Sequence, residues 1–398
     1  MLFIKQAVLC LISLLHLSRR FAKWWIPKSH ILKRVGEIYK RTSMKDLLKF
    51  RIKAFALIAI LLLSVVGGLS AKKIAIIDAG SSGSRLYVYD VNEVAPAPGV
   101  TIDILYPNAE EKELSKGPAL SGVKDCQECV DCFLTTMTSK YEVQKGEVID
   151  LYVLATAGMR LVDGTTANGI YTKMRHTSPV GYKLEKAMTI SGRYEGLYAW
   201  IAANYKARTL TWSSNSWHVN QTSCGILEIG GASMQIAFFP SSASSEGWTV
   251  SEGLNQIYSE SYLKGGVDQV FNYRKVTNAE DFGVTIARVE LPSESPTILG
   301  LGKPIKNAIA EWRQKKISSS SFEDYAASLE ITKDTYENYH PATNARYIAH
   351  VIDKLGLDID KIDVSTESDW TEGAALDIVV NNNDLQPEPF NYPPADPN

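Results

Sequence analysis

The sequence predicts an α/β protein built from two similar halves that face each other across a cleft. Residues 74–90, IAIIDAGSSGSRLYVYD, and residues 225–239, GILEIGGASMQIAFF, each join two apolar runs through an acid and a turn of small residues. With Glu228 aligned on Asp78, the small residues of the two turns align as well, at an offset of 150 residues. Two unrelated hairpins could match by chance, but the acid precedes the turn by the same interval in both. We therefore favour a duplicated strand–turn–strand unit.

Composition limits the class of protein. The chain has 398 residues, of which 45% are hydrophobic, and a formal net charge of -2. This size suits one large or two ordinary globular domains, and so small a charge argues against binding of nucleic acid by phosphate neutralisation. We expect a monomer without a nucleic-acid partner. The expected division is an extension over 1–71, a first domain over 72–190 to which 371–398 return, and a second domain over 191–370.

The N-terminal region has the pattern of a secretory signal peptide. Residues 54–71, AFALIAILLLSVVGGLSA, are apolar, follow a basic stretch and end in a plausible cleavage site after Ala71. A retained signal anchor is the alternative, although the apolar run is short for a bilayer span. Met44 begins a better-proportioned signal than Met1, which suggests that residues 1–43 are an over-long start. We expect an exported protein, periplasmic or secreted, with no permanent membrane span in the mature chain.

Cysteine spacing leaves two interpretations open. Four cysteines would remain after cleavage, an even number that suits disulfides in an oxidising compartment. The run CQECVDC also has a spacing at which thiolates ligate metals or clusters, but only one distant cysteine could complete a four-thiolate set. We favour disulfides, with a pairing that the sequence leaves open among Cys126, Cys129, Cys132 and Cys224.

The other elements follow from hydrophobic periodicity. Loops and short strands are expected over 95–122, a helix over 126–141 and a strand over 148–155. Apolar residues at helical spacing predict helices over 304–316 and 342–355. The stretch between these helices, KKISSSSFED, is interpreted as a surface loop, and the tail after Asn381 is polar and rich in proline.

Both turns have the composition of a phosphate-binding loop. Glycine allows consecutive N–H groups to point at one anion, and serine hydroxyls and an arginine add donors. The first turn looks longer than the two residues that a simple hairpin needs. A flexible loop is the alternative for either turn alone, whereas two such turns would clamp a chain of phosphates. The expected phosphate-binding residues of the turns are Gly80, Ser81, Ser82, Gly83, Ser84, Arg85, Gly230, Gly231 and Ala232.

Asp78 and Glu228 precede the two turns and should face each other across the cleft. Carboxylates next to phosphates repel them unless a cation lies between. Mg²⁺ or Ca²⁺, with Mn²⁺ also possible, would keep several waters and bridge phosphate oxygens. Two acids that simply end strands at the surface are the alternative.

Two further segments carry candidate site residues. ATAGMR, residues 155–160, follows a strand at the end where α/β sheets place ligands, so Thr156 and Arg160 are candidates for phosphate contact. In residues 190–205, ISGRYEGLYAWIAANY, Glu195 lies near a helix start, where most glutamates only favour the helix dipole and face solvent. The flanking glycines instead favour close approach by backbone or substrate. A carboxylate here could hold and deprotonate water, which accelerates a reaction by about a hundred- to ten-thousand-fold.

Taken together, DAGSSGSR, ATAGMR, SGRYEGLYAWIAANY and EIGGASMQ resemble, in order and spacing, the conserved regions of the nucleoside triphosphate diphosphohydrolases, or apyrases. DWTEGAALDI, residues 369–378, resembles a fifth region more weakly, so the resemblance spans residues 74–380. It implies two ribonuclease H-like domains of the actin/Hsp70/sugar kinase superfamily around an active-site cleft. It also implies stepwise removal of terminal phosphate from nucleoside tri- and diphosphates, without a phosphoenzyme. The chain looks like a soluble, bacterial-type member.

The resemblance also implies roles for single residues. Glu195 would be the general base for the attacking water, and Ser233 and Gln235 would help to position that water. Asp78 and Glu228 would hold the divalent ion through its water shell.

Trp370 matches a tryptophan near the metal, whereas other positions depart from the family's pattern. Glu228 stands where the family usually has Asp, and its longer side chain could change the metal's position or identity. Ser84 and Met234 stand where the family has Thr. For recognition of the base the candidate is Tyr347, with a surface tyrosine on a helix as the alternative.

Three other functions share parts of this pattern. An exopolyphosphatase or guanosine pentaphosphate phosphatase would have similar loops and a similar catalytic glutamate, but the export signal and Gln235 favour an apyrase. A sugar or acetate kinase needs a bound acceptor and abundant ATP, which export argues against. An actin-like nucleotide-binding protein would keep both loops without needing Glu195.

Overall fold

The computed structural model describes residues 71–94, 99–108, 110–213, 216–220, 222–240, 256–277, 282–291, 296–315, 321–329, 341–364 and 368–380. These residues all belong to one compact unit of the chain, Leu69–Asn398. The expected signal segment before Ala71 and the polar tail after Asn381 lie outside the described residues. Within the described part, no helix is both long and apolar enough to span a membrane.

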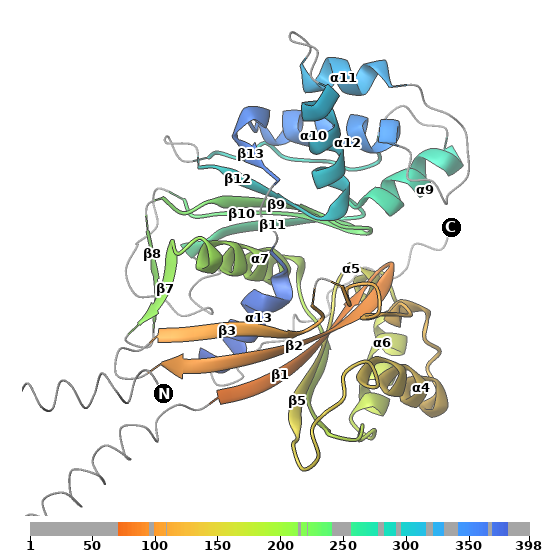
Figure 1. Ribbon diagram of the computed structural model, residues 1–398. Coiled ribbons are helices and arrows are strands. Elements are labelled where there is room, and N and C mark those ends of the chain that lie inside the picture. Colours follow the sequence, from red (N-terminus) through yellow and green to blue (C-terminus); the bar gives the residue numbers. More distant parts are fainter. Residues whose placement is uncertain are drawn as a thin grey trace, which may run out of the picture. The chain divides into compact units, whose positions relative to one another are not determined.

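Two mixed sheets form the framework, and their main strands follow the same order (Figure 1). In each sheet the main strand that comes first in the chain lies in the centre. It is antiparallel to the second main strand and parallel to the fourth main strand, where the short two-residue strand of the first sheet is not counted. The first sheet contains β1 (Ala71–Gly80), β2 (Gly83–Val94), β3 (Gly99–Tyr106), β5 (Ile149–Ala155) and β6 (Tyr182–Thr189), and the short β4 (Lys116–Gly117) pairs with β2. The second contains β9 (Gly225–Ile229), β10 (Ser233–Phe238), β11 (Tyr258–Leu263), β12 (Ile298–Leu301) and β13 (Ile362–Asp363). The predicted α/β fold with two ribonuclease H-like halves is confirmed.

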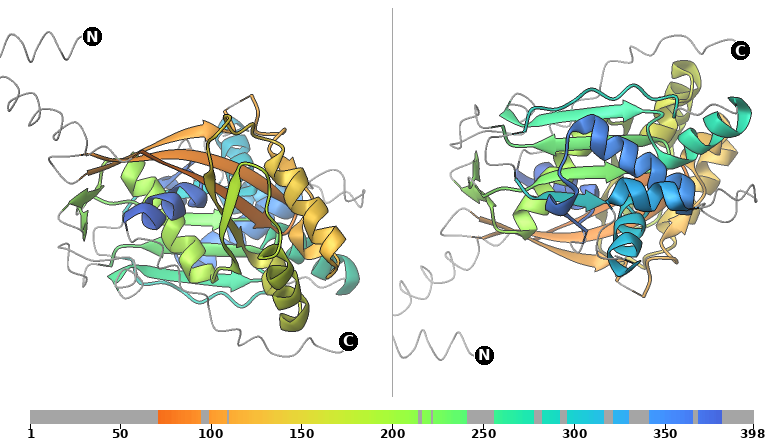
Figure 2. Two further views of the ribbon diagram at one scale, coloured as in Figure 1. Left: turned by 90° about the horizontal axis from the view of Figure 1, so that it is seen from below. Right: turned by 90° about the horizontal axis from the view of Figure 1, so that it is seen from above.

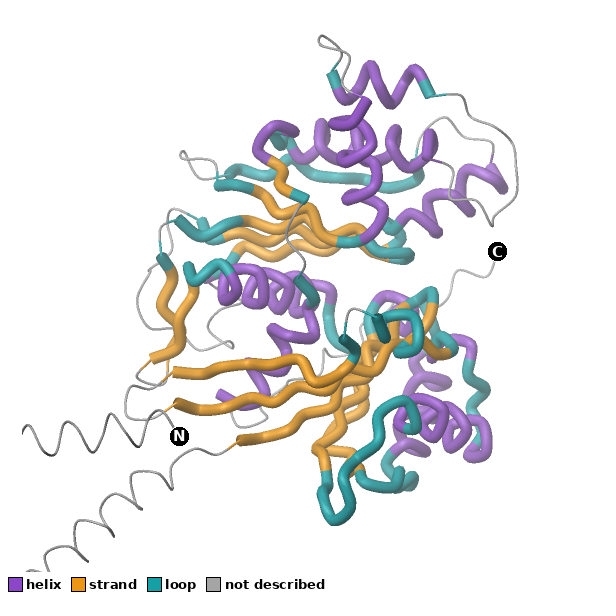
Figure 3. The backbone as a smooth tube through the Cα atoms, viewed as in Figure 1, coloured by secondary structure: helices purple, strands orange, loops and turns teal. Residues whose placement is uncertain are grey.

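Helices cover the outer faces of the sheets and also fill the space between them. α4 (Gln127–Thr138) and α6 (Gly164–Met174) pack on the first sheet, and α10 (Lys303–Lys315) and α12 (Pro341–Leu355) lie over the second in the view from above (Figure 2). α7 (Gly192–Lys206) and α13 (Trp370–Val380) lie between the two sets of strands (Figure 3). The remaining elements are α5 (Ala157–Arg160), α9 (Val267–Thr277), α11 (Phe322–Ser328), the hairpin of β7 (Leu210–Ser213) and β8 (Ser216–Val219), and the 3₁₀ helices η1 (Leu120–Gly122) and η2 (Ile359–Lys361).

The central elements are apolar because protein covers them on all sides. Ile76 and Ile77 on the two faces of β1 are fully buried, since helices pack on both faces of the sheet. In α7, 11 of 15 residues are buried, as expected of a helix enclosed by protein. Its Trp200 belongs to the same hydrophobic cluster as Ile74 of the first sheet and Ile226 of the second. Because α7 joins both sheets in one core, the domain boundary expected near residue 190 stays a prediction.

Most elements outside the turns agree with the sequence-based expectations in type. The elements expected to begin near residues 126, 148, 304 and 342 are α4, β5, α10 and α12. The expectation of a surface loop over KKISSSSFED is wrong for the last residues of this stretch, because α11 begins at Phe322. Ser321 and Asp324 form a capping box there, which satisfies the first N–H groups of the helix.

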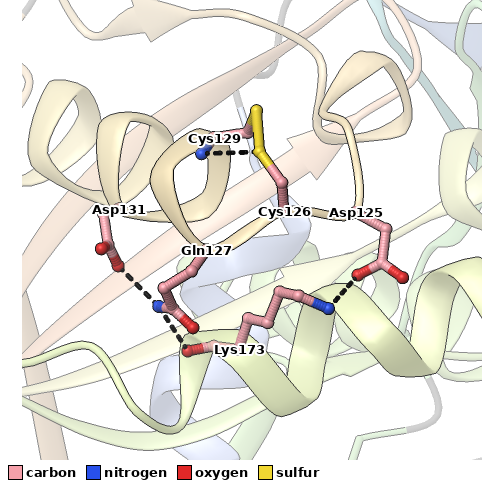
Figure 4. The surroundings of a disulfide bond; sticks show 6 residues. All are labelled: Asp125, Cys126, Gln127, Cys129, Asp131 and Lys173. Atoms are coloured by element: carbon pink, nitrogen blue, oxygen red, sulfur yellow. Dashed lines mark hydrogen bonds and ion pairs between the residues drawn. A yellow bond between two sulfur atoms is a disulfide. The ribbon is translucent and has the colours of Figure 1, made fainter.

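The cysteine run lies at the start of α4 (Figure 4). Cys126 and Cys129 form a disulfide, and Cys126 Sγ also accepts a hydrogen bond from the Cys129 backbone N–H at 3.2 Å. Cys132 is an exposed free thiol, and Cys224 is a half-buried one. Across the described ranges, no group of three or more His, Cys, Asp and Glu side chains is arranged to hold a metal ion. The structure therefore favours a disulfide over a four-thiolate site.

The crossing of α7 and α13 requires a glycine, which gives a test of the core. A Cβ built on Gly373 would lie 2.0 Å from the carbonyl oxygen of Tyr198. We expect Gly373→Ala to destabilise the protein by about 1 to 3 kcal/mol, because backbone atoms cannot move aside as a side chain can. Thermal unfolding followed by circular dichroism measures the loss. Gly164→Ala is the control, since no atom lies within 4 Å of its Cβ position; equal melting temperatures for the two variants would contradict the tight crossing.

Candidate functional site

A cleft of about 570 Å³ lies between the sheets and contains both turns. Residues from β1, β2 and β9 and from the starts of α7 and α13 contribute to its walls. The predicted site residues that line it are Asp78, Gly80, Ser81, Ser82, Gly83, Arg85, Thr156, Glu195, Glu228, Gly230, Gly231, Ala232, Ser233 and Trp370. The predicted residues outside the lining are Ser84, Arg160, Gln235 and Tyr347.

The two turns approach each other closely. A Cβ built on Gly231 would lie 2.9 Å from Oγ of Ser81 and 2.5 Å from Oδ2 of Asp268, so glycine alone fits without displacement. The first turn is also tighter than the sequence suggested. Its strands remain paired up to Gly80, which leaves Ser81 and Ser82 as a two-residue turn. The turns are therefore close enough to contact one polyanion together.

Backbone hydrogen bonds hold the second turn in place. The N–H of Val267 donates to the carbonyl oxygen of Gly230 at 3.0 Å, and the N–H of Asp268 donates to that of Gly231 at 2.9 Å. Both donors belong to the start of α9, so this helix fixes the turn. With these carbonyl oxygens already engaged, less negative charge faces an incoming anion.

Glu195 lies in a hydrogen-bonded group with the two other predicted catalytic residues. Ser191 caps α7 by accepting a hydrogen bond from the Tyr194 N–H at 3.2 Å, and Glu195 follows in the first turn with 7% of its surface exposed. Gln235 Nε2 donates to Glu195 Oε2 at 3.1 Å and to Ser233 Oγ at 2.6 Å. Gln235 thus connects the carboxylate to the serine that lines the cleft.

Arg160 binds Glu195 and does not face the cleft. Its Nη2 donates to Glu195 Oε2, and its Nη1 donates to Ser261 Oγ at 3.4 Å. The expected phosphate contact is therefore corrected: a buried guanidinium pairs with the nearest carboxylate, because an unpaired buried charge is costly. Burial raises the pKa of Glu195, and the positive charge of Arg160 opposes that increase. Arg160 both orients the carboxylate and limits the rise of its pKa.

The glycines that flank Glu195 do allow close approach, but the groups that approach them are side chains of the protein. A Cβ on Gly192 would lie 2.0 Å from Ser261 Oγ, and one on Gly196 would lie 2.7 Å from Ser259 Oγ. Both serines belong to β11 of the second sheet. The glycines thus let α7, which carries Glu195, pack closely against the sheet that carries Gln235.

Several carboxylates share the cleft, and burial together with neighbouring negative charge raises the pKa of two of them, Asp78 and Glu228. Burial raises the pKa of Asp78 well above its usual range, the charge of Asp369 raises it further, and Arg85 opposes the effect. Burial also raises the pKa of Glu228 well above its usual range, and the charges of Glu195 and Asp369 add to it. Asp78 is only 8% exposed. The alternative that it ends a strand at the surface is therefore wrong.

The acid pair fits a divalent cation held through water. Asp78 Oδ1 and Glu228 Oε2 are buried, and neither atom has a hydrogen-bond partner. Hard cations prefer carboxylate oxygens, and Mg²⁺ usually keeps several of its own waters. These carboxylates are thus suited to the cation that the sequence implies.

Further lining residues were not recognised from the sequence. Tyr87 donates through its hydroxyl to Asp369 Oδ2 at 2.7 Å, and the Thr371 N–H donates to Asp369 Oδ1 at 3.0 Å. Asp369 directly precedes Trp370, so the Asp-Trp pair was the available signal, but an acid before a helix is common. The lining residues missed in this way are Tyr87, Lys116, Asp268, Lys303 and Asp369.

Ser84 does not contact the cleft, contrary to expectation. Its side chain is fully buried, and its Oγ has no hydrogen-bond partner. Successive side chains of a strand point to opposite faces. Because Arg85 lines the cleft, Ser84 points to the other face of β2.

Tyr347 is a core residue, which overturns its expected role in stacking on a base. It is 1% exposed, its hydroxyl donates to the carbonyl oxygen of Gly265 at 2.6 Å, and its ring centroid lies 5.2 Å from that of Phe282. The alternative of a surface tyrosine is equally wrong. The apolar face of α12 is wide enough to bury this side chain in the hydrophobic cluster of the second half.

Residues 70–278, just over half of the chain, match the GDA1/CD39 (nucleoside phosphatase) family. The chain belongs to this family. The predicted resemblance to nucleoside triphosphate diphosphohydrolases is confirmed at that level, whereas the soluble, bacterial-type subclass stays a prediction.

Curated relatives of this chain carry related names. Nucleoside-triphosphatase ntp-1 of Caenorhabditis elegans is 33% identical over 242 residues, which cover 57% of this chain and 38% of the relative. Nucleoside-diphosphatase mig-23 of the same species is 32% identical over 178 residues, 41% of this chain and 32% of the relative. Ectonucleoside triphosphate diphosphohydrolase 7 of Mus musculus is 31% identical over 189 residues, 42% and 31% respectively. The matched part of the chain spans about a third of the length of these relatives.

Two solved structures resemble the chain only distantly. A nucleoside triphosphate hydrolase from Neospora caninum has 18% sequence identity and a TM-score of 0.38, over 55% of this chain and 50% of that one. A Ppx/GppA family member from Aquifex aeolicus has 13% identity and a TM-score of 0.39, over 79% and 99%. Neither similarity supports an argument about function.

The crowded acids of the cleft give a stability test. The pKa of Asp78 is higher in the folded protein than in an unfolded chain, so its ionisation at neutral pH costs folding free energy. We expect Asp78→Asn to raise the melting temperature of the metal-free protein at neutral pH, by roughly 2 to 4 °C for each kcal/mol relieved. The gain should shrink as the pH falls below the folded-state pKa, where wild-type Asp78 is protonated.

Magnesium separates this effect from a general gain in stability. Mg²⁺ should raise the melting temperature of the wild type and raise that of Asp78→Asn less. Exposed Asp353→Asn is the control and should change neither value. A metal-free Asp78→Asn variant that melts below the wild type at neutral pH would contradict the charge argument.

Proposed function

We propose that this protein removes the terminal phosphate of nucleoside tri- and diphosphates by direct attack of water. The observation that carries the proposal is the hydrogen-bonded group of Glu195, Gln235 and Ser233 at a cleft whose walls include both turns. The carboxylate suits a water-activating base, and the turns suit a phosphate chain. The relatives' names, nucleoside-diphosphatase and nucleoside-triphosphatase, fit this substrate class.

In the proposed reaction each group has one task. The turns at Ser81 and Gly231 hold the terminal phosphates between them. Ser233 and Gln235 orient the attacking water, and Glu195 accepts its proton as the new oxygen–phosphorus bond forms. The bond from the terminal phosphorus to the bridging oxygen breaks, and the shortened nucleotide leaves with that oxygen and its negative charge. A second round converts the diphosphate to the monophosphate.

The same proposal assigns the acids to a divalent cation. Asp78 and Glu228, with Trp370 beside them, would hold Mg²⁺ or Ca²⁺ through water, and Mn²⁺ is a further candidate. When bound, the cation neutralises charge on the phosphate oxygens and on the leaving group. Without it, the buried acids would repel the substrate.

We also propose that the protein acts outside the cytoplasm. The proposal rests on the signal-like segment 54–71, of which residues 54–70 lie outside the described part of the chain. The Cys126–Cys129 disulfide is compatible with an oxidising compartment.

The base is tested by Glu195→Gln. This variant should lose about a hundred- to ten-thousand-fold in kcat, because the amide cannot accept the proton of water. Binding of a non-hydrolysable ADP analogue should remain, since the turns are unchanged. Phosphate release from ATP, ADP and polyphosphate, with and without Mg²⁺, provides the assay, and exposed Glu142→Gln is the control. Retained turnover would exclude Glu195 as the base, and hydrolysis of polyphosphate without that of ADP would favour an exopolyphosphatase.

The role of Arg160 is tested by the pH dependence of kcat/KM. Arg160 lowers the pKa of Glu195, so Arg160→Gln should raise that pKa. Because the base works only when ionised, the acid limb of the profile should move to higher pH. Arg160→Lys keeps the charge and should restore part of the shift. An acid limb that stays in place or moves to lower pH in Arg160→Gln would contradict this coupling.

A further inference from the structure

A row of charged side chains crosses three neighbouring strands at the cleft. Asp78 on β1 lies directly opposite Arg85 on β2, and Arg85 lies directly opposite Lys116 on β4. Directly opposed residues of a sheet point to the same face, and all three line the cleft. With strands about 4.8 Å apart, the backbone at Lys116 lies roughly 10 Å from that at Asp78. The row leads from the proposed cation site to a pair of positive charges.

The other half of the protein contributes a third positive charge. Lys303, the first residue of α10, lines the same cleft. Lys303 and Lys116 are exposed, whereas Glu195 is buried. The cleft thus has a buried end with the proposed base and an exposed end with cations from both halves.

Lys116 is carried by an ordered backbone. Ser115 before it is fully buried, and its carbonyl oxygen accepts a hydrogen bond from the Leu86 N–H at 3.3 Å. A Cβ on Gly117 after it would lie 2.3 Å from Met137 Sδ of α4. The position of this lysine is therefore set by strand pairing and by packing against a helix.

The paired cations have an energetic cost that a ligand would relieve. Like charges directly opposite each other destabilise a sheet, yet Arg85 and Lys116 occupy such a pair. Glu113 provides a built-in anion, with its Oε2 2.5 Å from Lys116 Nζ. Lys116 lowers the pKa of Glu113, and Lys303 and Arg85 lower it further. This carboxylate marks a position at which all three cations favour a negative charge.

We propose that Arg85, Lys116 and Lys303 form a distal anion subsite that binds the phosphoryl group farthest from the scissile bond of a triphosphate. A diphosphate that places its terminal phosphate at Glu195 has no third phosphoryl group to reach this position. The subsite therefore selects triphosphates over diphosphates, and Glu113 competes with the substrate for it. This inference rests on the proposed nucleotide-hydrolysing function.

The test compares methylene-bridged analogues of ATP and ADP by titration calorimetry with Mg²⁺ present. Lys116→Gln/Lys303→Gln should weaken binding of the ATP analogue about tenfold and that of the ADP analogue less than about threefold, since charge-assisted contacts to the third phosphate are lost. Glu113→Gln should tighten binding of the ATP analogue by about two- to threefold, because the competing anion is removed. The opposite signs separate a binding role from damage to the fold.

Lys145→Gln, in the exposed loop that precedes β5, removes the same charge outside the cleft and should change neither affinity. Equal weakening of both analogues in the double lysine variant, or weaker ATP-analogue binding in Glu113→Gln, would overturn the subsite. A wild type that binds both analogues but releases no phosphate from ATP or ADP would contradict the proposed function and still allow the subsite comparison. A wild type that binds neither analogue would contradict both.

Discussion

The site depends on the close approach of two turns that lie 150 residues apart in the chain. Ser81 of the first turn and Gly231 of the second are so close that a single added Cβ would meet the serine hydroxyl. This contact is possible because each turn ends the central part of its own sheet, and α7 holds the sheets in one core. A phosphate chain is a ligand that two such turns can share, because backbone N–H groups and hydroxyls can surround it from both sides. The position of the proposed base follows from the same packing, since α7 also carries Glu195.

A second consequence is the crowding of negative charge. Asp78, Glu195, Glu228 and Asp369 all line one cleft, and burial raises the pKa of the first three. Such crowding of buried carboxylates lowers the stability of the protein when no ligand is bound. Carboxylates with strongly raised pKa values are found mainly at functional sites. Arg160 compensates part of this loss of stability at Glu195. A divalent cation at the proposed site would compensate more, and the buried oxygens of Asp78 and Glu228 without hydrogen-bond partners are suited to it.

The sequence predicted the fold and most of the candidate residues that line the cleft, because both depend on local patterns. An acid followed by small residues between apolar runs identified both turns. The flanking glycines drew attention to Glu195, although in the structure they make room for serines of β11. Prediction failed where a side chain's direction depends on register. Ser84 and Arg85 were both assigned to phosphate because the turn was taken as longer than two residues, whereas the actual pairing sends them to opposite faces.

Other features depend on contacts between distant segments and had no local signal. Arg160 pairs with Glu195 across 35 positions of the chain, so its partner becomes evident only in the fold. Tyr347 was assigned to base recognition, with an exposed position as the alternative, because periodicity marks only the centre of an apolar face, and α12 buries a wider arc than this. Lys116 and Lys303 belong to no motif, and only the fold brings them to one cleft.

The central claim is that both turns bind one polyphosphate, and hydrogen–deuterium exchange tests it most directly. Glu195→Gln would be titrated with ADP and Mg²⁺ while exchange is followed in peptides covering residues 78–85 and 228–235. The account predicts protection of both segments with the same dependence on nucleotide concentration. Protection of one segment alone, or two different concentration dependences, would contradict it.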